Sequence, residues 1–109
     1  MKEKLDFLKN KILYQICIGA NETIFNFSGD VSITVESKFE IVGNDETLFS
    51  RGADISKKLL GAAIVEATID IDKTLKITFN NSYLQLRIFG KNDGYESYQI
   101  VDKNNNIVH

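Results

Sequence analysis

The sequence predicts a mainly β fold of the α+β class, an antiparallel sandwich or open barrel with two short helices. Apolar and polar residues alternate along several short segments, which is the two-residue period of a half-buried strand. The connections between these segments are shorter than the roughly dozen residues that a parallel crossover needs, so antiparallel strands are expected. The chain has 109 residues, of which 43% are hydrophobic, which is enough for one core. We therefore expect one domain over residues 1–109, with halves of about 1–53 and 54–109.

The first half is expected to begin with a helix and to continue as strands. Residues 2–10 place leucines three positions apart on one face, which predicts a short amphipathic helix. The next segments predict strands over 12–18, which is apolar on both faces, over 23–27 and over 31–35. Residues 39–42 are expected to extend the third of these strands past a bulge.

The middle of the chain is predicted to be a loop followed by a helix. Residues 43–53 begin with a polar stretch and are the best candidate for a mobile loop. The carboxylate of Asp54 can accept the free N–H groups of a first helical turn. A second short helix is therefore predicted over 55–60, with Gly61 at its end.

The second half has the clearest strand pattern. Alternation predicts strands over 65–71, 75–79 and 84–88, then a strand over 95–101 and a short one at 107–108. The inward residues of the first of these strands are expected to be Val65, Ala67, Ile69 and Ile71.

The hydrophobic pattern also predicts how these strands pair. Placing Ile71 opposite Leu75 leaves a three-residue loop and keeps the apolar residues on one face. Placing Phe79 opposite Leu84 leaves residues 81–82 as a tight turn, because Asn tolerates a positive φ.

A faint internal repeat relates the two halves at an offset of 52 residues. If it reflects a duplication, which the sequence leaves open, the halves are expected to pack as a pseudo-symmetric sandwich or open barrel. The matched pairs are Leu8 with Leu60, Ile12 with Ile64, Leu13 with Val65, Cys17 with Ile69, Phe25 with Ile77 and Phe27 with Phe79.

Composition disfavours several classes of partner. The 13 basic residues are scattered among 15 acidic ones, the net charge is −2, and the only arginines are Arg51 and Arg87, which disfavours nucleic-acid binding. The first residues include acids and are not followed by an apolar core, so no signal peptide is expected. No apolar run reaches the roughly 18 residues of a membrane span. With Cys17 as the only cysteine, a reducing cytoplasm is the expected location.

The sequence predicts neither an enzyme nor a cofactor or metal site. His109 is the only histidine and the last residue of the sequence, so a nucleophile has no good candidate base. Cys17 lies in an apolar run and is expected to be a small core residue. Asp70 and Asp72 are expected on a solvated sheet face, with Asp70 opposite Lys76.

Two segments combine exposed aromatic residues with acids and are the candidate partner-binding sites. Loops carry function more often than their share, and tyrosine is enriched at interfaces. The alternatives are that the mid-chain phenylalanine fills the core and that the tyrosines close the end of a sheet. The candidate residues are Asp45, Glu46, Phe49, Asp54, Tyr95, Glu96 and Tyr98.

The order of segments from residue 59 to residue 100 carries a family resemblance. It runs Leu-Leu-Gly (59–61), a strand, a hairpin of the form Leu-x-Ile-x-Phe-x-Asn, then Leu-x-Leu-x-Ile and Tyr-Glu-Ser-Tyr (95–98). This pattern resembles a family of small uncharacterised bacterial proteins, some of which are similar to the immunity proteins encoded beside polymorphic toxins. The chain departs from that pattern at its C-terminal end, which lacks a glycine-rich tail.

The resemblance implies a stoichiometric binder that neutralises a toxin by protein–protein contact and has no catalytic residues. The acids near the middle of the chain could face a basic toxin domain. Two other classes stay open: a small-ligand-binding β-barrel, which needs an apolar cavity with a few polar groups, and a self-associating structural module that uses an exposed sheet edge. A toxin gene next to this one would favour the first class, and a large internal pocket would favour the second.

Overall fold

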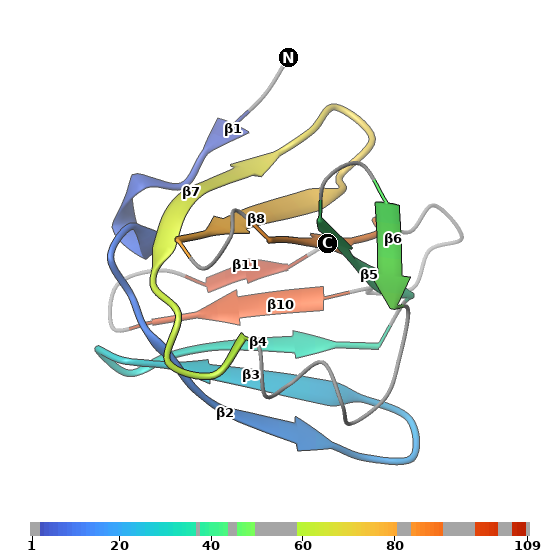
Figure 1. The fold of residues 1–109 in the computed structure, drawn as a ribbon, viewed down its shortest axis with the longest axis horizontal. Helices are drawn as coiled ribbons and strands as arrows, with labels where there is room; N and C mark the ends of the chain where they lie inside the picture. The colour runs from blue at the N-terminus through green and yellow to red at the C-terminus, as the bar shows by residue number, and fades with distance from the viewer. Residues whose placement is uncertain are drawn as a thin grey trace.

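The chain folds into two antiparallel β-sheets that pack face to face as a β-sandwich (Figure 1). The computed structural model describes residues 3–36, 38–43, 46–49, 59–80, 84–90, 98–102 and 106–108. One sheet has the order β1 (Glu3–Lys4), β7 (Ile64–Ile69), β8 (Leu75–Phe79), β9 (Gln85–Ile88), β5 (Phe39–Gly43), β6 (Glu46–Phe49). The other has the order β11 (Asn106–Val108), β10 (Tyr98–Val101), β4 (Val31–Val35), β3 (Thr23–Phe27), β2 (Leu13–Ile18). The mainly β, antiparallel prediction is confirmed; the described strands form no closed barrel.

The helix predicted over residues 2–10 is wrong. The segment forms the two-residue strand β1 and a single 3-10 turn, η1 (Asp6–Leu8). A helix of nine residues is marginal without tertiary contacts, and here the backbone pairs with β7 instead: the N–H of Leu5 donates to the carbonyl of Ala67 at 2.9 Å. No helix of seven or more residues occurs in the described parts of the chain, and most of the second predicted helix, 55–60, lies outside them.

The middle of the chain differs from the prediction in two ways. Residues 39–42 do not extend β4 but form β5 in the opposite sheet, where Phe39 lies opposite Ile88. Within the predicted 43–53 loop, β6 pairs with β5 as an antiparallel strand, starting from Gly43 opposite Glu46. The sequence suggested a loop because residues 43–47 are polar. An edge strand, however, can carry charged side chains while one side of its backbone pairs with the sheet.

A β-bulge changes which residues of β7 face the core. The pairing with β8 shifts between Ile64 and Glu66, so Ile64 is buried while Val65 is 44% exposed. The bulge inserts one unpaired residue, which breaks the strict alternation that the sequence suggested.

The predicted pairing of Ile71 with Leu75 is also wrong. Ile69 lies opposite Leu75, and Ile71 is 78% exposed in the connection that follows β7. That connection is closed by a hydrogen bond from the Asp70 N–H to the Thr74 carbonyl at 2.9 Å. The two-residue shift leaves Ile69 on the buried face, because the side-chain period of a strand is two.

The second predicted register is confirmed. Ile77 lies opposite Leu86, and the N–H of Phe79 donates to the carbonyl of Leu84 at 2.8 Å. The predicted turn at 81–82 lies outside the described residues. The short strand predicted at 107–108 is present as β11.

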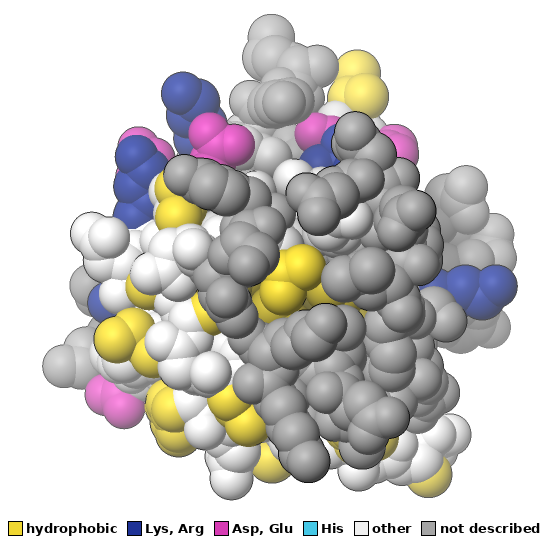
Figure 2. Space-filling model, in the orientation of Figure 1, with side chains coloured by type: hydrophobic (Ala, Val, Ile, Leu, Met, Phe, Trp, Pro, Cys, Tyr) yellow, Lys and Arg dark blue, Asp and Glu magenta, His cyan; other side chains and the backbone are white. Residues whose placement is uncertain are grey.

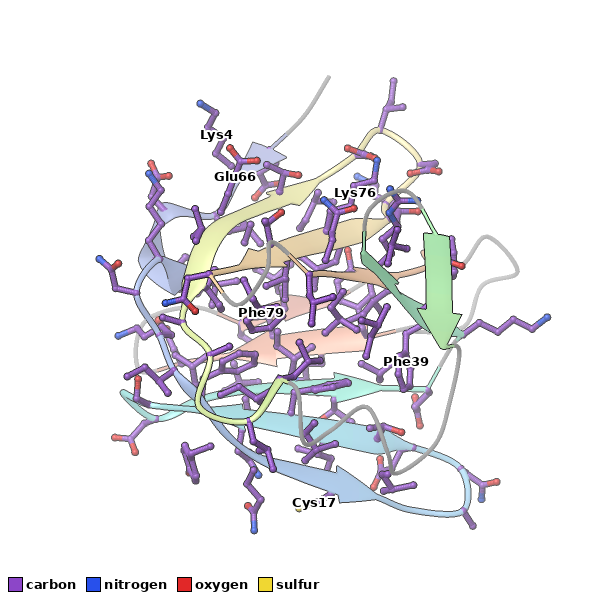
Figure 3. The ribbon with its side chains drawn as sticks, viewed as in Figure 1. Lys4, Cys17, Phe39, Glu66, Lys76 and Phe79 are labelled. Atoms are coloured by element: carbon purple, nitrogen blue, oxygen red, sulfur yellow. The ribbon has the colours of Figure 1, made fainter. Side chains whose placement is uncertain are left out.

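The core lies between the two sheets and is held by aromatic contacts across them. The rings of Phe27 and Phe79 stack with centroids 6.4 Å apart, and those of Phe25 and Phe39 meet edge to face at 5.5 Å. Figure 3 shows Phe39 and Phe79 pointing into the interior of the sandwich. Such pairs contribute about 0.5–1.5 kcal/mol beyond the burial of their area.

The two halves of the chain follow the same topology. Strands β2, β3 and β4 are neighbours in one sheet, and β7, β8 and β9 are neighbours in the other. The next two strands of each half then cross over: β5 and β6 join β9, whereas β10 and β11 join β4. Each sheet is therefore built from three strands of one half and two of the other, besides β1.

Equivalent hydrogen bonds recur in both halves, and they correct the offset read from the sequence. Between β2 and β7 the offset is 51 residues, so Leu13 corresponds to Ile64 and Cys17 to Thr68; the connection after β2 is one residue shorter than that after β7. The equivalent bonds are Leu13 N–H to Ala62 O (3.0 Å) and Ile64 N–H to Lys11 O (2.9 Å), and Ile12 N–H to Ser28 Oγ (3.0 Å) and Ala63 N–H to Asn80 Oδ1 (3.1 Å).

The corrected register of β7 is testable with one matched pair of substitutions. Ile69→Ala removes a buried side chain and should lower the free energy of unfolding by about 2–5 kcal/mol. Ile71→Ala changes an exposed side chain and should cost less than about 0.5 kcal/mol. Urea denaturation of the two variants measures both values, and equal losses would restore the register that the sequence suggested.

Candidate functional site

The structure describes only some of the residues that the sequence singled out. Asp45, Asp54, Tyr95 and Glu96 lie outside the described residues. Glu46 and Phe49 are the first and last residues of β6, and the description covers their backbone but not their side chains. Of the seven candidates, Tyr98 alone has a described side chain.

Strand β6 forms one edge of the six-stranded sheet, since β5 is its only strand neighbour in the described part of the chain. Residues 46–49 of the segment that was expected to be a loop are therefore held by backbone pairing at a sheet edge, and residues 44–45 and 50–53 lie outside the described residues. Two acidic side chains lie on the nearby chain: Glu36 is exposed, and Glu40 on β5 is 3.7 Å from the guanidinium of Arg87 on β9.

Tyr98 belongs to the core and is not a surface residue. Its side chain is 1% exposed, and its hydroxyl donates a hydrogen bond to the backbone carbonyl of Lys73 at 2.7 Å. This bond joins β10 in one sheet to the β7–β8 connection of the other. Burial, and then the negative charges of Glu3 and Asp72, raise the pKa of the Tyr98 phenol well above its usual 10.0. The Tyr98 side chain therefore has no surface to offer to a partner.

Cys17 is exposed, so its prediction as a core residue is wrong. Cys17 lies opposite Ile24 on β3 and follows a bulge in β2, where the pairing shifts between Leu13 and Gln15. Figure 3 shows the Cys17 side chain at the rim of the molecule, far from Phe79 in the core.

Strand β2 carries an apolar surface that the sequence did not predict. Tyr14 is 62% exposed and Ile18 is 49% exposed, and the neighbouring Cys17 is exposed as well. Figure 2 shows apolar side chains at the lower left of the molecule, in the region where Figure 1 places β2. The sequence of this strand is apolar on both faces, which suggested a central strand. The only sign of an exposed apolar strand in the sequence was the absence of any charged residue over 12–18, and this absence is equally typical of a buried strand.

The two aspartates near the β7–β8 connection do not share one strand face. Asp70 directly follows β7 and forms an ion pair with Lys76 at 2.7 Å. Asp72 lies within the connection, where its Oδ1 accepts the N–H of Thr74 at 3.1 Å. Both carboxylates therefore stabilise a turn. Figure 2 shows acidic and basic side chains together at the top of the molecule.

Among the described residues, no group of three or more His, Cys, Asp or Glu side chains is placed to hold a metal ion. Within the same residues, no helix is long and apolar enough to cross a membrane. No protein-family model matches the chain, and no curated protein or solved structure matches it significantly.

The buried phenol predicts a specific dependence of stability on pH. The unfolded chain releases the Tyr98 proton near pH 10, whereas the folded chain holds it to higher pH. The contribution of the protonated Tyr98 phenol to the free energy of unfolding is therefore complete below about pH 10 and is lost as the pH rises above it. Tyr98→Phe should cost about 1 kcal/mol at neutral pH through the lost hydrogen bond. The difference from the wild type should shrink above pH 10.

Urea denaturation at a series of pH values measures this difference. Tyr14→Phe is the matched control, because Tyr14 is exposed and its replacement should change stability little at any pH. A constant difference between the Tyr98→Phe variant and the wild type from pH 8 to above about pH 10 would contradict the assignment.

Proposed function

We propose that this protein is a non-enzymatic bacterial binding protein of the immunity type, which neutralises a toxin in the cytoplasm by protein–protein contact. The observation that carries the proposal is the position of β6: the acidic and aromatic segment around Glu46 and Phe49 is an edge strand of the sandwich. The resemblance of residues 59–100 to proteins similar to immunity proteins gives the class of partner.

An edge strand suits protein recognition because its outer backbone groups can pair with a strand of another chain. A segment that is already ordered by pairing with β5 loses less conformational entropy on binding than a free loop does. Strand β6 therefore offers the partner an already ordered backbone whose sequence begins with an acidic residue, Glu46, and ends with an aromatic one, Phe49.

The charges around β6 favour a basic partner. Glu46 is part of the strand, Glu36 lies on the chain leading into β5, and Glu40 lies on β5 itself. The sequence places Asp45 directly before β6 and Asp54 five residues after it. An acidic rim speeds the encounter with a basic surface and sets its orientation, while a central aromatic residue contributes most to the lifetime of the complex.

A small-ligand-binding barrel is less well supported. The described strands form two open sheets, and the space between them holds the stacked rings of Phe27 and Phe79. A ligand would have to displace these core side chains.

The proposal predicts a toxin gene beside this one, and it is tested with the toxin domain which that gene encodes. Surface plasmon resonance at several salt concentrations should show that Glu46→Gln slows association and weakens its salt dependence, whereas Phe49→Ala speeds dissociation. Glu66→Gln is the matched control, because Glu66 is exposed on β7, near the other edge of the same sheet.

Binding that responds equally to Glu46→Gln and Glu66→Gln would contradict the assignment of β6. No binding to the adjacent toxin domain, with both proteins folded, would contradict the immunity class itself.

A further inference from the structure

The outer edge of β2 has no strand partner among the described residues. Strand β3 pairs with one side of β2. On the other side, Leu13 donates its N–H to Ala62 and accepts a hydrogen bond from Gly61 at 2.8 Å. Beyond Leu13 the described residues supply no further backbone partner to this edge.

The equivalent edge in the other half shows which groups of β2 face outward. Strand β7 is paired on this side with β1, through a hydrogen bond from Leu5 to the Ala67 carbonyl and the pairing of Glu3 with Ile69. At the offset of 51, Ala67 and Ile69 correspond to Ile16 and Ile18 of β2. Antiparallel pairs alternate between hydrogen-bonded and non-hydrogen-bonded positions. Ile16 and Ile18 therefore direct their backbone groups outward, and Cys17 between them is a non-hydrogen-bonded position.

The side chains of β2 lack the usual protection of an edge strand. Edge strands are normally guarded by charged side chains or proline, or are covered by other elements. The segment Leu13–Ile18 contains no charged residue and no proline, whereas the edge strands β1 and β6 carry charges. Two copies of β2 can therefore meet without bringing like charges together.

We propose that β2 pairs antiparallel with β2 of a second copy of this chain, about a two-fold axis that passes beside Cys17. This register places Ile16 opposite Ile18 of the second copy and Ile18 opposite Ile16, so both outward-facing positions are hydrogen-bonded. The bulge at Tyr14 and the turn after Ile18 lie outside the paired stretch. The contact uses the same surface on both copies, which is the common form of a homodimer, and it is independent of the toxin-binding proposal for β6.

The register makes a chemical prediction about Cys17. Directly opposed residues at a non-hydrogen-bonded position have Cα atoms about 4.5 Å apart, which lies within the roughly 4.4–6.8 Å that a disulfide spans. Diamide, a diazene oxidant, should therefore link the two copies. Two thiols each lose one hydrogen, a sulfur–sulfur bond forms, and the two electrons and two protons reduce the diazene to a hydrazine.

Analytical ultracentrifugation of the reduced protein tests the dimer. The wild type should show a reversible monomer–dimer equilibrium, and Ile18→Lys should raise its Kd about tenfold or more by placing a charge at the paired edge. Ile71→Lys is the matched control: it makes the same change at an exposed isoleucine in the β7–β8 connection, which Figure 1 shows on the opposite side of the molecule from β2. A monomeric wild type, or equal effects of the two variants, would overturn the proposal.

Cross-linking and hydrogen exchange test the register. Diamide should link wild-type chains rapidly. The double variant Cys17→Ser, Gln15→Cys should link slowly, because residue 15 of one copy would lie opposite residue 19 of the other and not opposite a second cysteine. Equal rates would overturn the proposed axis. The amides of Ile16 and Ile18 should become protected as the protein concentration rises. Protection that does not depend on concentration would show that this edge is filled within one chain, and would overturn the dimer.

Discussion

The fold depends on the antiparallel contact between the beginnings of its two halves. The N–H of Leu13 donates to Ala62, and the N–H of Ile64 donates to Lys11, so the first residues of β2 and β7 each bond to the chain just before the other strand. Beyond this point the halves diverge into opposite sheets, and each later sends two strands across to the other's sheet. Neither sheet is complete without both halves. The chain must therefore lose the entropy of closing long loops before these distant contacts can stabilise the fold.

The sequence predicted the strands best where side chains on one face decide the register. Ile77 and Leu86 are both buried, and any one-residue slip would expose them, so their pairing could be derived in advance. The sequence repeat also related Phe27 to Phe79, and the two rings stack in the core. The prediction failed at Val65 and Ile71, because hydrophobic alternation cannot reveal where a bulge interrupts it or how long a turn is.

The candidate site was less predictable, because exposure depends on which strands lie at the edges. A strand that is apolar on both faces is expected in the middle of a sheet, and Cys17 was assigned to the core for that reason. Sheet order is set by long-range pairing that a single sequence does not display. The polar segment containing Glu46 and Phe49 was expected to be a loop, yet it forms an edge strand because β5 supplies its backbone partners. The sequence left open whether Tyr98 faces a partner or closes the end of a sheet. Its hydrogen bond to the carbonyl of Lys73 places it in the core.

The two halves use equivalent positions differently. In β7 the outer edge is covered by β1, whose Glu3 and Lys4 are charged and exposed. In β2 the corresponding edge carries Ile16, Cys17 and Ile18, and no charge. No described strand covers the edge of β2 as β1 covers that of β7. An apolar edge without charge or proline exposes a folded protein to uncontrolled association, and a specific partner at that edge prevents it. A symmetric pairing of two β2 strands supplies one, and it leaves β6, in the other sheet, available for a different protein.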